Sequence, residues 1–430
     1  MWSSRVLGAV ATSVVYAAGA LAQAQPPPQV LVPVPARQIT FQAAIAQAIE
    51  ANPTVKTAVA VILRAEGMLR QARAATLLQV TANATTTTLN TDVEFQGVTV
   101  TPQNSLAASV TADMPIVAAA AWARHAQAKD TVEVAQLNAA DVRRQVAFAT
   151  ADAYLTILGT RRVVEANIVA RDVAKAHYDL AAELERRGTG SRLNALRAQG
   201  QWSADEAIVE TAQLSLYRAQ EALGVLIASN EPVDAADEPE FAVPPADEGS
   251  LAVFRTDLKL FAAEQHAAEH VLRDSSKDWW PTLDAVFQPS TTVPAPFFLP
   301  AYSWRLLMQG NAPIFDSGQR ASLKMQRQAS VDQARETLAG ASLQAASEVR
   351  AAREAVASTE RSLASLRAAA SQAEQVVMIT SISFRAGAAT NIEVIDAQRS
   401  ARDAATAAAV SEDNVRRARL ELLNALGRFP

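Results

Sequence analysis

The sequence contains no cysteine among its 430 residues. This absence excludes disulfide bonds, thiolate metal sites and a lipid on an N-terminal cysteine. Aromatic residues are also scarce, at 5%. Apolar residues make up 50% of the chain, but alanine supplies much of that share. Such a composition suits closely packed helices better than a bulky globular core.

The sequence also lacks a strong charge of one sign, because 39 Lys and Arg residues are set against 44 Asp and Glu residues, for a formal net charge of −5. Without a basic surface the chain has no electrostatic footprint for nucleic acid, and that class of partner is excluded. Beyond the first residues, no uninterrupted apolar run reaches the roughly 18 residues of a membrane-spanning helix. The protein can therefore enter a membrane only through strands or an interfacial surface.

Residues 1–24 have the pattern of a cleaved secretory signal peptide. Arg5 supplies the basic start, "VLGAVATSVVYAAGALA" the apolar stretch, and Ala22-Gln23-Ala24 the small-residue cleavage site. An uncleaved anchor is the alternative. We expect an exported, unlipidated protein that continues with a Pro-rich linker at 25–37.

The remaining chain contains two copies of one unit, at 38–229 and 250–430. The opening stretch "ITFQAAIAQAIEANPTVKTA" predicts a helix, a break and a second helix, and "LAVFRTDLKLFAAEQHAAEH" is its counterpart. Between the copies, residues 230–249 are acidic and Pro-rich, which predicts a solvated linker or a short surface subdomain.

Each copy then changes from the helical period to the two-residue period of strands. The expected strands are 79–90, 104–114, 282–290 and 301–311. Pro115 and Pro313 mark the strand-to-helix transitions. Long helical patterns with a coiled-coil rhythm follow, at roughly 117–186 and 316–385. A helix of about 70 residues would be about 105 Å long, which exceeds an ordinary globular domain.

Two glycine-containing turns end these helices, in "RRGTGSRLNALRAQ" and "RAGAATNIEVIDAQ". The second turn has Glu393 and Asp396 where the first has Asn194 and Arg197. The two carboxylates are three residues apart, so they lie on one helix face. Stabilisation of a helix N-terminus by its dipole is the simpler explanation, at about 0.3 to 1 kcal/mol.

Four strands in one chain are too few to close a barrel, and open strand edges in lipid cost several kcal/mol for each unpaired group. Three chains would contribute twelve strands, within the range of outer-membrane barrels. Aromatic residues near the strand ends suit the aromatic girdles of such barrels; they are Trp279, Trp280, Tyr302 and Trp304. The alternative is a soluble four-stranded sheet that caps a helical rod.

In the order of these features, from "ITFQAAIAQAIEANP" through "MPIV", "APIFDSGQR" and the two turns to "LNALG", the sequence resembles the TolC-like outer-membrane efflux proteins. The resemblance implies a mostly α fold with a small β part: a homotrimer with a twelve-stranded β-barrel and an α-barrel of long coiled-coil hairpins. Residues 230–249 would lie in its equatorial region. It also implies a non-enzymatic channel without cofactors.

By the same resemblance, the protein is an exit duct in the outer membrane of a Gram-negative bacterium and extends into the periplasm. A periplasmic adaptor (membrane fusion) protein and an inner-membrane RND, ABC or MFS transporter would be its partners, in efflux or in type I secretion. The candidate adaptor contacts are the tip residues Gly188, Thr189, Gly190, Gly387 and Ala388. Gly at these points could equally serve only the turn.

The resemblance places Glu393 and Asp396 at the periplasmic mouth, where a trimer would gather six carboxylates that attract cations. Asn194 and Arg197 form a candidate brace beside this ring, although a solvated Arg197 is an equal alternative. Relatives often carry a basic residue after the tip glycine, whereas this chain has Ala388 and Ala389.

Two alternatives of other classes remain open. One is a periplasmic coiled-coil scaffold without a pore. The other is a zinc hydrolase that uses "HAAEH", in which His266 and His270 could share a metal ion and Glu269 could act as base. The first copy has no counterpart of either histidine, which favours surface histidines and no metal site.

Overall fold

The computed structural model describes residues 36–243, 254–295, 297 and 300–429. The chain separates into Met1–Pro35 and Ala36–Pro430, and all elements below belong to the second unit. The expected signal peptide, most of the Pro-rich linker and part of the linker at 230–249 therefore lie outside the described residues.

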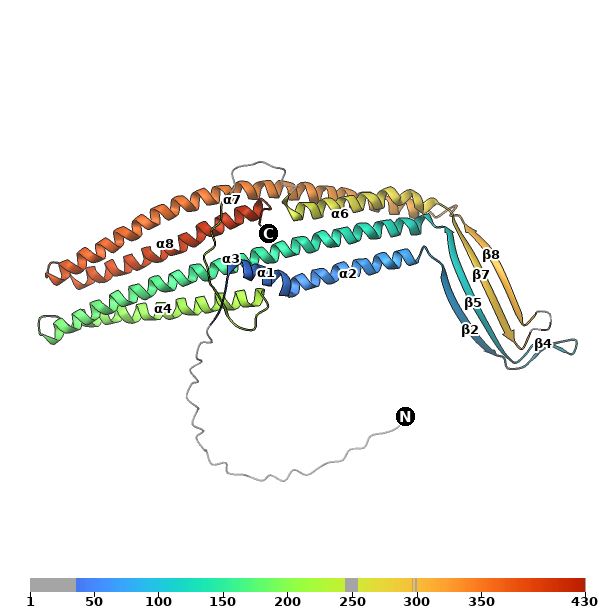
Figure 1. The fold of residues 1–430 in the computed structure, drawn as a ribbon, viewed down its shortest axis with the longest axis horizontal. Coiled ribbons are helices and arrows are strands. Elements are labelled where there is room, and N and C mark those ends of the chain that lie inside the picture. Colours follow the sequence, from blue (N-terminus) through green and yellow to red (C-terminus); the bar gives the residue numbers. More distant parts are fainter. Residues whose placement is uncertain (1–35, 244–253, 296, 298–299, 430) are drawn as a thin grey trace, which may run out of the picture. The chain divides into compact units, whose positions relative to one another are not determined.

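The first half consists of the helices α1 (Phe41–Ala51), α2 (Pro53–Ala74), α3 (Ala119–Arg186) and α4 (Arg192–Leu226). Asn52 separates α1 from α2, and its side-chain oxygen accepts a hydrogen bond of 2.8 Å from the Thr54 N–H. Pro53 can begin α2 because the first helical residue needs no N–H partner. The helices α3 and α4 then form a long hairpin (Figure 1).

The second half contains α6 (Thr256–Arg273), the 3-10 helix η1 (Asp274–Trp279), α7 (Gln319–Arg385) and α8 (Asn391–Ala425). Helices α7 and α8 form the second hairpin (Figure 1). Helix α3 packs against α1, α2, α4, α6, η1 and α8, whereas the helices beside α7 are α6, η1 and α8. The mostly helical fold class that the sequence predicts is confirmed. Among the described residues, no helix is both long and apolar enough to cross a membrane.

A four-stranded antiparallel sheet has the order β2-β5-β7-β8. Its strands are β2 (Gln79–Thr88), β5 (Asn104–Val117), β7 (Thr282–Val293) and β8 (Tyr302–Asn311). The strands β2 and β8 form its two edges (Figure 1). Each half of the chain therefore contributes one edge strand and one central strand.

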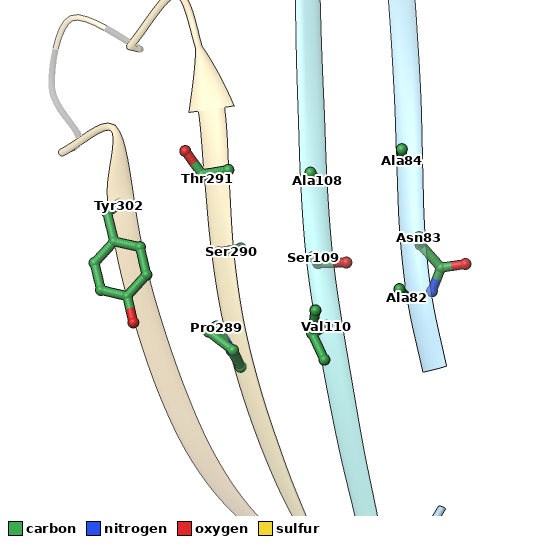
Figure 2. A pocket seen from close by; sticks show the side chains of 10 residues that line it. All are labelled: Ala82, Asn83, Ala84, Ala108, Ser109, Val110, Pro289, Ser290, Thr291 and Tyr302. Atoms are coloured by element: carbon green, nitrogen blue, oxygen red, sulfur yellow. The ribbon is translucent and has the colours of Figure 1, made fainter. Parts of the chain in front are cut away.

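The sheet has one apolar and one polar face. One row across the four strands consists of Val80, Ala112, Phe287 and Leu306. A row on the opposite face consists of Asn83, Ser109, Ser290 and Ser303, in which the last two hydroxyls are 3.0 Å apart. Figure 2 shows Asn83, Ser109 and Ser290 of this row; with the neighbouring small residues and Tyr302, they border a hollow of about 380 Å³.

Two short pairings were not predicted from the sequence. Between β2 and β5, strands β3 (Val93–Phe95) and β4 (Val98–Thr101) form a hairpin, whose turn residues Gln96 and Gly97 have φ of 53° and 79°. Positive φ at both central residues is the requirement of a tight hairpin turn. The second is a parallel pair of β1 (Arg37–Ile39) and β6 (Val233–Ala235).

The second pairing brings the β6 segment of the linker at 230–249 into the core. Val233 and Ala235 are buried. The Tyr154 hydroxyl is 3.1 Å from the Ile39 carbonyl oxygen and accepts a hydrogen bond of 3.0 Å from the Asp237 N–H. The same hydroxyl donates to the Asp237 carboxylate. Burial and this carboxylate raise the pKa of Tyr154 to about 12. This segment thus joins the start of the first repeat to the middle of α3.

Helices α3 and α8 approach closely at Gly159. A Cβ atom at this glycine would lie 2.8 Å from the Asp413 Cγ, so that no larger residue fits without movement. Asp413 is buried and accepts a hydrogen bond of 2.7 Å from the Arg417 Nε. Burial raises the pKa of Asp413. The crossing of the two hairpins is therefore fixed at this position.

Candidate gate at the hairpin tips

The first tip joins α3 to α4 through a turn that needs two glycines. Gly188 has φ of +74°, a conformation that costs glycine nothing. The N–H groups of Thr189 and Gly190 donate to the Leu184 carbonyl oxygen at 3.0 and 2.8 Å. A Cβ atom at Gly190 would lie 2.8 Å from the Leu184 Cβ. The turn requirement thus accounts for both glycines without reference to a partner.

The second tip uses one glycine and a capping box. Gly387 has φ of +75°, and the Ala388 N–H donates to the Ser383 carbonyl oxygen at 2.8 Å. The Thr390 hydroxyl then accepts from the Glu393 N–H at 3.4 Å, while the Glu393 carboxylate accepts from the Thr390 N–H at 2.8 Å. These reciprocal bonds satisfy two donors at the start of α8.

Glu393 therefore has the capping role, and its charge remains accessible. Both Glu393 and Asp396 are exposed. They are three residues apart on one face of α8. Neither carboxylate forms an ion pair within the part of the chain that the structure describes. The acidic turn thus presents two unpaired negative charges beside a fixed helix start.

The candidate brace is only partly connected to this turn. The Asn194 carbonyl oxygen accepts a hydrogen bond of 3.3 Å from the Asn391 side chain at the start of α8. Arg197 is exposed and forms no ion pair with any described residue. Within one chain, the candidate brace therefore contacts the start of α8 through the Asn194 backbone carbonyl and the Asn391 side-chain amide.

His177 of α3, to which the sequence assigned no role, completes this junction. Its Nε2 atom is 2.7 Å from the Asn391 Oδ1. Its ring meets the Phe384 ring edge-on at a centroid distance of 5.2 Å. Burial lowers the pKa of His177. The junction thus links α3, α4 and both sides of the second tip through a neutral imidazole.

A second cross-link joins α4 to α8 further from the tips. The Arg402 Nη1 is 2.6 Å from the Asp205 Oδ1, and the Asp205 side chain is only 4% exposed. Nearby, the Arg399 Nε donates to the Gln201 Oε1 at 2.6 Å, and Gln201 donates to Asp205 at 3.0 Å. In the sequence, the only sign of this cross-link is a polar pair at helical spacing in each helix, Gln201 with Asp205 and Arg399 with Arg402. The spacing within each pair does not show that the two pairs contact each other.

The two prolines occupy different positions. Pro115 lies inside β5, opposite Asp284, and the register shifts between Pro115 and Val117. Pro313 lies between the end of β8 and the start of α7. In this connection Gly318 has φ of +88°. The transition in the first half therefore begins within the strand, and the one in the second half lies in a loop.

The "HAAEH" stretch lies on α6 and contacts α3. The His270 Nδ1 atom contacts the Asp130 carboxylate, and its Nε2 is 3.6 Å from the Asp274 Oδ2. His266 is exposed, and the Glu269 carboxylate accepts from Gln265 at 2.8 Å. Within the described ranges, no group of three His, Asp or Glu side chains is arranged to hold a metal ion.

Comparison with known proteins assigns this arrangement to a family. The sequence model of the outer membrane efflux protein family matches residues 44–229 and 251–428. The chain belongs to the outer membrane efflux protein family. The resemblance seen in the sequence is thereby confirmed, and the family is one of outer-membrane channels, not of enzymes. No curated protein matches the chain.

Solved structures with the same fold include other outer-membrane proteins. The Campylobacter jejuni CmeC outer membrane channel is 15% identical, with a TM-score of 0.79 over 90% of this chain and 86% of that one. The outer membrane protein VceC from Vibrio cholerae is 18% identical, with a TM-score of 0.75 over 90% and 96%. The open state of the Neisseria gonorrhoeae MtrE outer membrane channel is 18% identical, with a TM-score of 0.74 over 90% and 88%. At these identities the likeness establishes the shared fold.

Proposed function

We propose that three copies of this outer membrane efflux protein associate head to tail into a duct. It would carry substrates from a periplasmic adaptor and an inner-membrane transporter to the exterior. The observation that carries the proposal is that each copy has two unpaired edges of matching kind. One edge consists of β2, α2 and α4, and the other consists of β8 and α7.

The sheet edges support closure through strand pairing. The edge strands β2 and β8 have 10 residues each and are paired on one side only. Pairing β8 of one copy with β2 of the next would satisfy the open backbone groups, as lipid requires. A head-to-tail contact closes into a ring when its rotation permits. With three copies the ring has twelve strands, and the apolar face would be turned to lipid.

The helical edges also expose apolar side chains, and these recur at the same spacing on α7 and on α4. On α7, Met325, Leu343 and Ile379 are 74%, 74% and 64% exposed. They are separated by whole numbers of turns, because about 18 residues make five turns of a helix. Leu196 and Leu214 of α4 have the same separation, and both are exposed. Apposition of the two stripes between neighbouring copies would bury them.

The tips are the proposed contact for the partners. Gly188, Thr189, Gly190, Gly387 and Ala388 would meet the periplasmic adaptor, and an RND, ABC or MFS transporter would supply the energy. Three copies of Glu393 and Asp396 would form a ring of six carboxylates at the mouth. Asn194 and Arg197 of the first tip would brace that ring. We infer that the duct lies in the outer membrane and that its helical part extends into the periplasm.

Planar bilayer recordings of the purified protein, combined with its mass in detergent, test the proposal. We expect trimers and uniform single-channel conductance. A monodisperse protein that never conducts would contradict the duct and support a periplasmic scaffold instead. Because the two readouts are independent, a conducting species of another stoichiometry would retain the duct and reject the trimer.

A further inference from the structure

The helical turns that lie next to the large sheet carry free positive charge. Arg73 of α2, Lys129 of α3, Arg273 of α6 and Lys324 of α7 are exposed and form no ion pair with any described residue. We call these four residues the basic collar. Along the helices they lie within about 15 Å of the ends that join the sheet. Their charge contrasts with the formal net charge of −5 of the whole chain.

The acidic side chains of the same turns are already paired. Asp274 is 2.8 Å from the Lys277 ammonium, and Asp278 is 2.6 Å from the Arg327 guanidinium. The other acidic residues each contact a basic residue or a histidine; the pairs are Glu66 with Arg70, Asp130 with His270 and Asp316 with Arg320. The charge that remains available beside the sheet is therefore positive.

The hydrogen bonds of the sheet fix the direction of its apolar face. The Leu89 N–H donates to the Gln103 carbonyl oxygen at 2.7 Å, so the odd-numbered residues of β2 direct their backbone groups toward β5. In a view with β2 running upward and β5 on its right, L-residues of this kind point their side chains toward the viewer. The alternate residues, such as Val80 and Ala82, point away. The apolar face is thus on the far side in this view.

The helices continue the strands in one layer, because α2 leads into β2, β5 into α3, η1 into β7 and β8 into α7 (Figure 1). Successive residues of a helix are rotated by about 100°. Asp130 of α3, which runs downward, contacts His270 on its right, so Lys129 points to the far side. Asp274, at the end of the upward α6, is 3.2 Å from Gln127 on its left, so the preceding Arg273 also points to the far side.

The other two members of the collar lie on the same side of the layer. Ala65 of α2 is buried, and α3 is the helix that packs along this part of α2. Arg73 comes eight residues later and is rotated by about 80° to the far side. On α7, Arg327 contacts Asp278 of η1 on its left, and Lys324, three residues earlier, is rotated by about 60° to the far side. All four cations therefore share the side of the apolar sheet face.

Exposed apolar side chains lie between the collar and the sheet. On α3, Trp122 is exposed and precedes Lys129 by seven residues, which is about two turns on the same face. After α2, the exposed Leu77 follows Arg73 by four residues on the way to β2. From the sheet toward the helices, the surface thus changes from apolar strands through an aromatic or aliphatic side chain to a cation. This is the order of groups at a membrane interface.

We propose that the basic collar binds the anionic headgroups of a phospholipid leaflet. The proposal rests on the proposed function, in which the apolar face of the sheet is turned to lipid. The headgroup layer adjoins the hydrocarbon core, and long basic side chains near that boundary extend into it. Lys and Arg residues near an anionic surface are attracted to it, and the attraction is screened within a Debye length. The partner is a lipid surface and not a soluble anion, because the cations are spread over four helices and surround no pocket.

Spin-labelled phosphatidylglycerol and phosphatidylcholine test the collar in phosphatidylcholine vesicles that contain the full-length protein. Electron paramagnetic resonance measures how much of each labelled lipid the protein immobilises. We expect the protein to prefer phosphatidylglycerol, and high salt to weaken this preference. Arg73→Gln with Lys129→Gln should lower the preference roughly two- to fivefold, since each cation near an anionic surface adds an attraction of about that size.

Arg64→Gln with Arg124→Gln is the matched control, because it removes the same charge from two exposed positions on the side of the polar sheet face. Arg64 directly precedes the buried Ala65, and Arg124 is rotated by about 120° from Asp130 toward that side. The lipid preference should remain unchanged in this variant. Equal association of the two lipids, or an equal loss in both double variants, would overturn the proposal. Displacement of the labelled lipid by soluble glycerol phosphate would also overturn it, in favour of a discrete phosphate site.

Conductance in neutral phosphatidylcholine bilayers and the mass in detergent report on the duct separately. A protein that prefers phosphatidylglycerol but does not conduct would retain the collar and reject the duct. A conducting protein without a lipid preference would do the reverse. A protein that immobilises neither lipid would contradict both.

Discussion

The helices α3 and α7 are equivalent in the repeat and almost equal in length, at 68 and 67 residues, yet their surroundings differ. Helix α3 packs against five other α-helices and buries large side chains such as Tyr154, Leu155 and Ile157. Helix α7 packs mainly against α6 and α8 and buries only small aliphatic residues among those described; they are Val331, Ala345, Val349, Ala352 and Val356. Since α7 also exposes large apolar side chains, it borders a surface that a single chain leaves open.

The largest expected effect comes from a charge on the open side of α7. Leu343→Glu combined with Ile379→Glu should abolish the trimer, because burial of an unpaired carboxylate in an apolar contact costs several kcal/mol. Native mass spectrometry or light scattering of the purified protein would report monomers. Val169→Glu on α3 is the matched control, since that valine is 64% exposed but lies away from both edges. Intact trimers in the double variant would show that the exposed apolar side of α7, like that of α3, does not hold the copies together.

A smaller effect is expected where the two hairpins meet. Asp205→Ala leaves the largely buried Arg402 without its closest partner, and removal of one member of a buried pair costs about 3 kcal/mol. Hydrogen exchange at the first turns of α8 should accelerate accordingly. Asp403→Ala removes the exposed partner of the same arginine and should cost less than about 1 kcal/mol. Similar exchange in both variants would show that burial does not distinguish the two contacts.

Acidification should loosen the junction at His177. Burial lowers the pKa of His177 in the folded protein below the ordinary value of 6.5, so the opened state binds the proton more readily. Stability of the junction should therefore fall as the pH drops through 6.5 toward the lower folded pKa, by at most about 1.4 kcal/mol per pH unit for one proton. Hydrogen exchange near Asn391 measures this slope. His177→Gln should flatten it, whereas exposed His266→Gln should not.

The smallest effect separates the capping role of the acidic turn from its charge. Glu393→Gln with Asp396→Asn retains a capping box and removes both charges, so cation block of conductance should weaken while helix stability is kept. Thr390→Ala should cost about 0.5 to 2 kcal/mol at the start of α8 and leave the block unchanged. If the block is the same in the charge-neutral variant and the original protein, the carboxylates serve only the helix.

The fold class could be predicted because its periodicities extend over many residues. The long helices and the four strands of the large sheet repeat a pattern often enough to be recognised. The strands β1, β3, β4 and β6 have three or four residues each, which is too few for a two-residue period. The pairing of β1 with β6 also joins positions almost two hundred residues apart, so that no local sequence pattern predicts it.

The candidate site, like the fold, could be predicted from the sequence only in part. Gly188, Gly387 and the acidic pair could be located because turn and cap preferences are local properties of the sequence. The contacts of His177 with Asn391 and of Arg402 with Asp205 could not, since they depend on how α8 lies against α3 and α4. Whether the acidic pair gates a duct remains a prediction for the conductance measurements.

The close approach at Gly159 has a mechanical consequence. A side chain there would collide with Asp413, so the two hairpins approach most tightly at this point. Nearer the tips they are also joined by the Arg402–Asp205 pair and the His177–Asn391 contact. About 27 residues separate this point from the end of α3, a lever of about 40 Å. A rotation of about 5° at this fulcrum would displace the tips by about 3.5 Å, roughly the width of an ion with part of its water shell. In the proposed duct, small angular changes far from the tips would thus alter the width of the mouth.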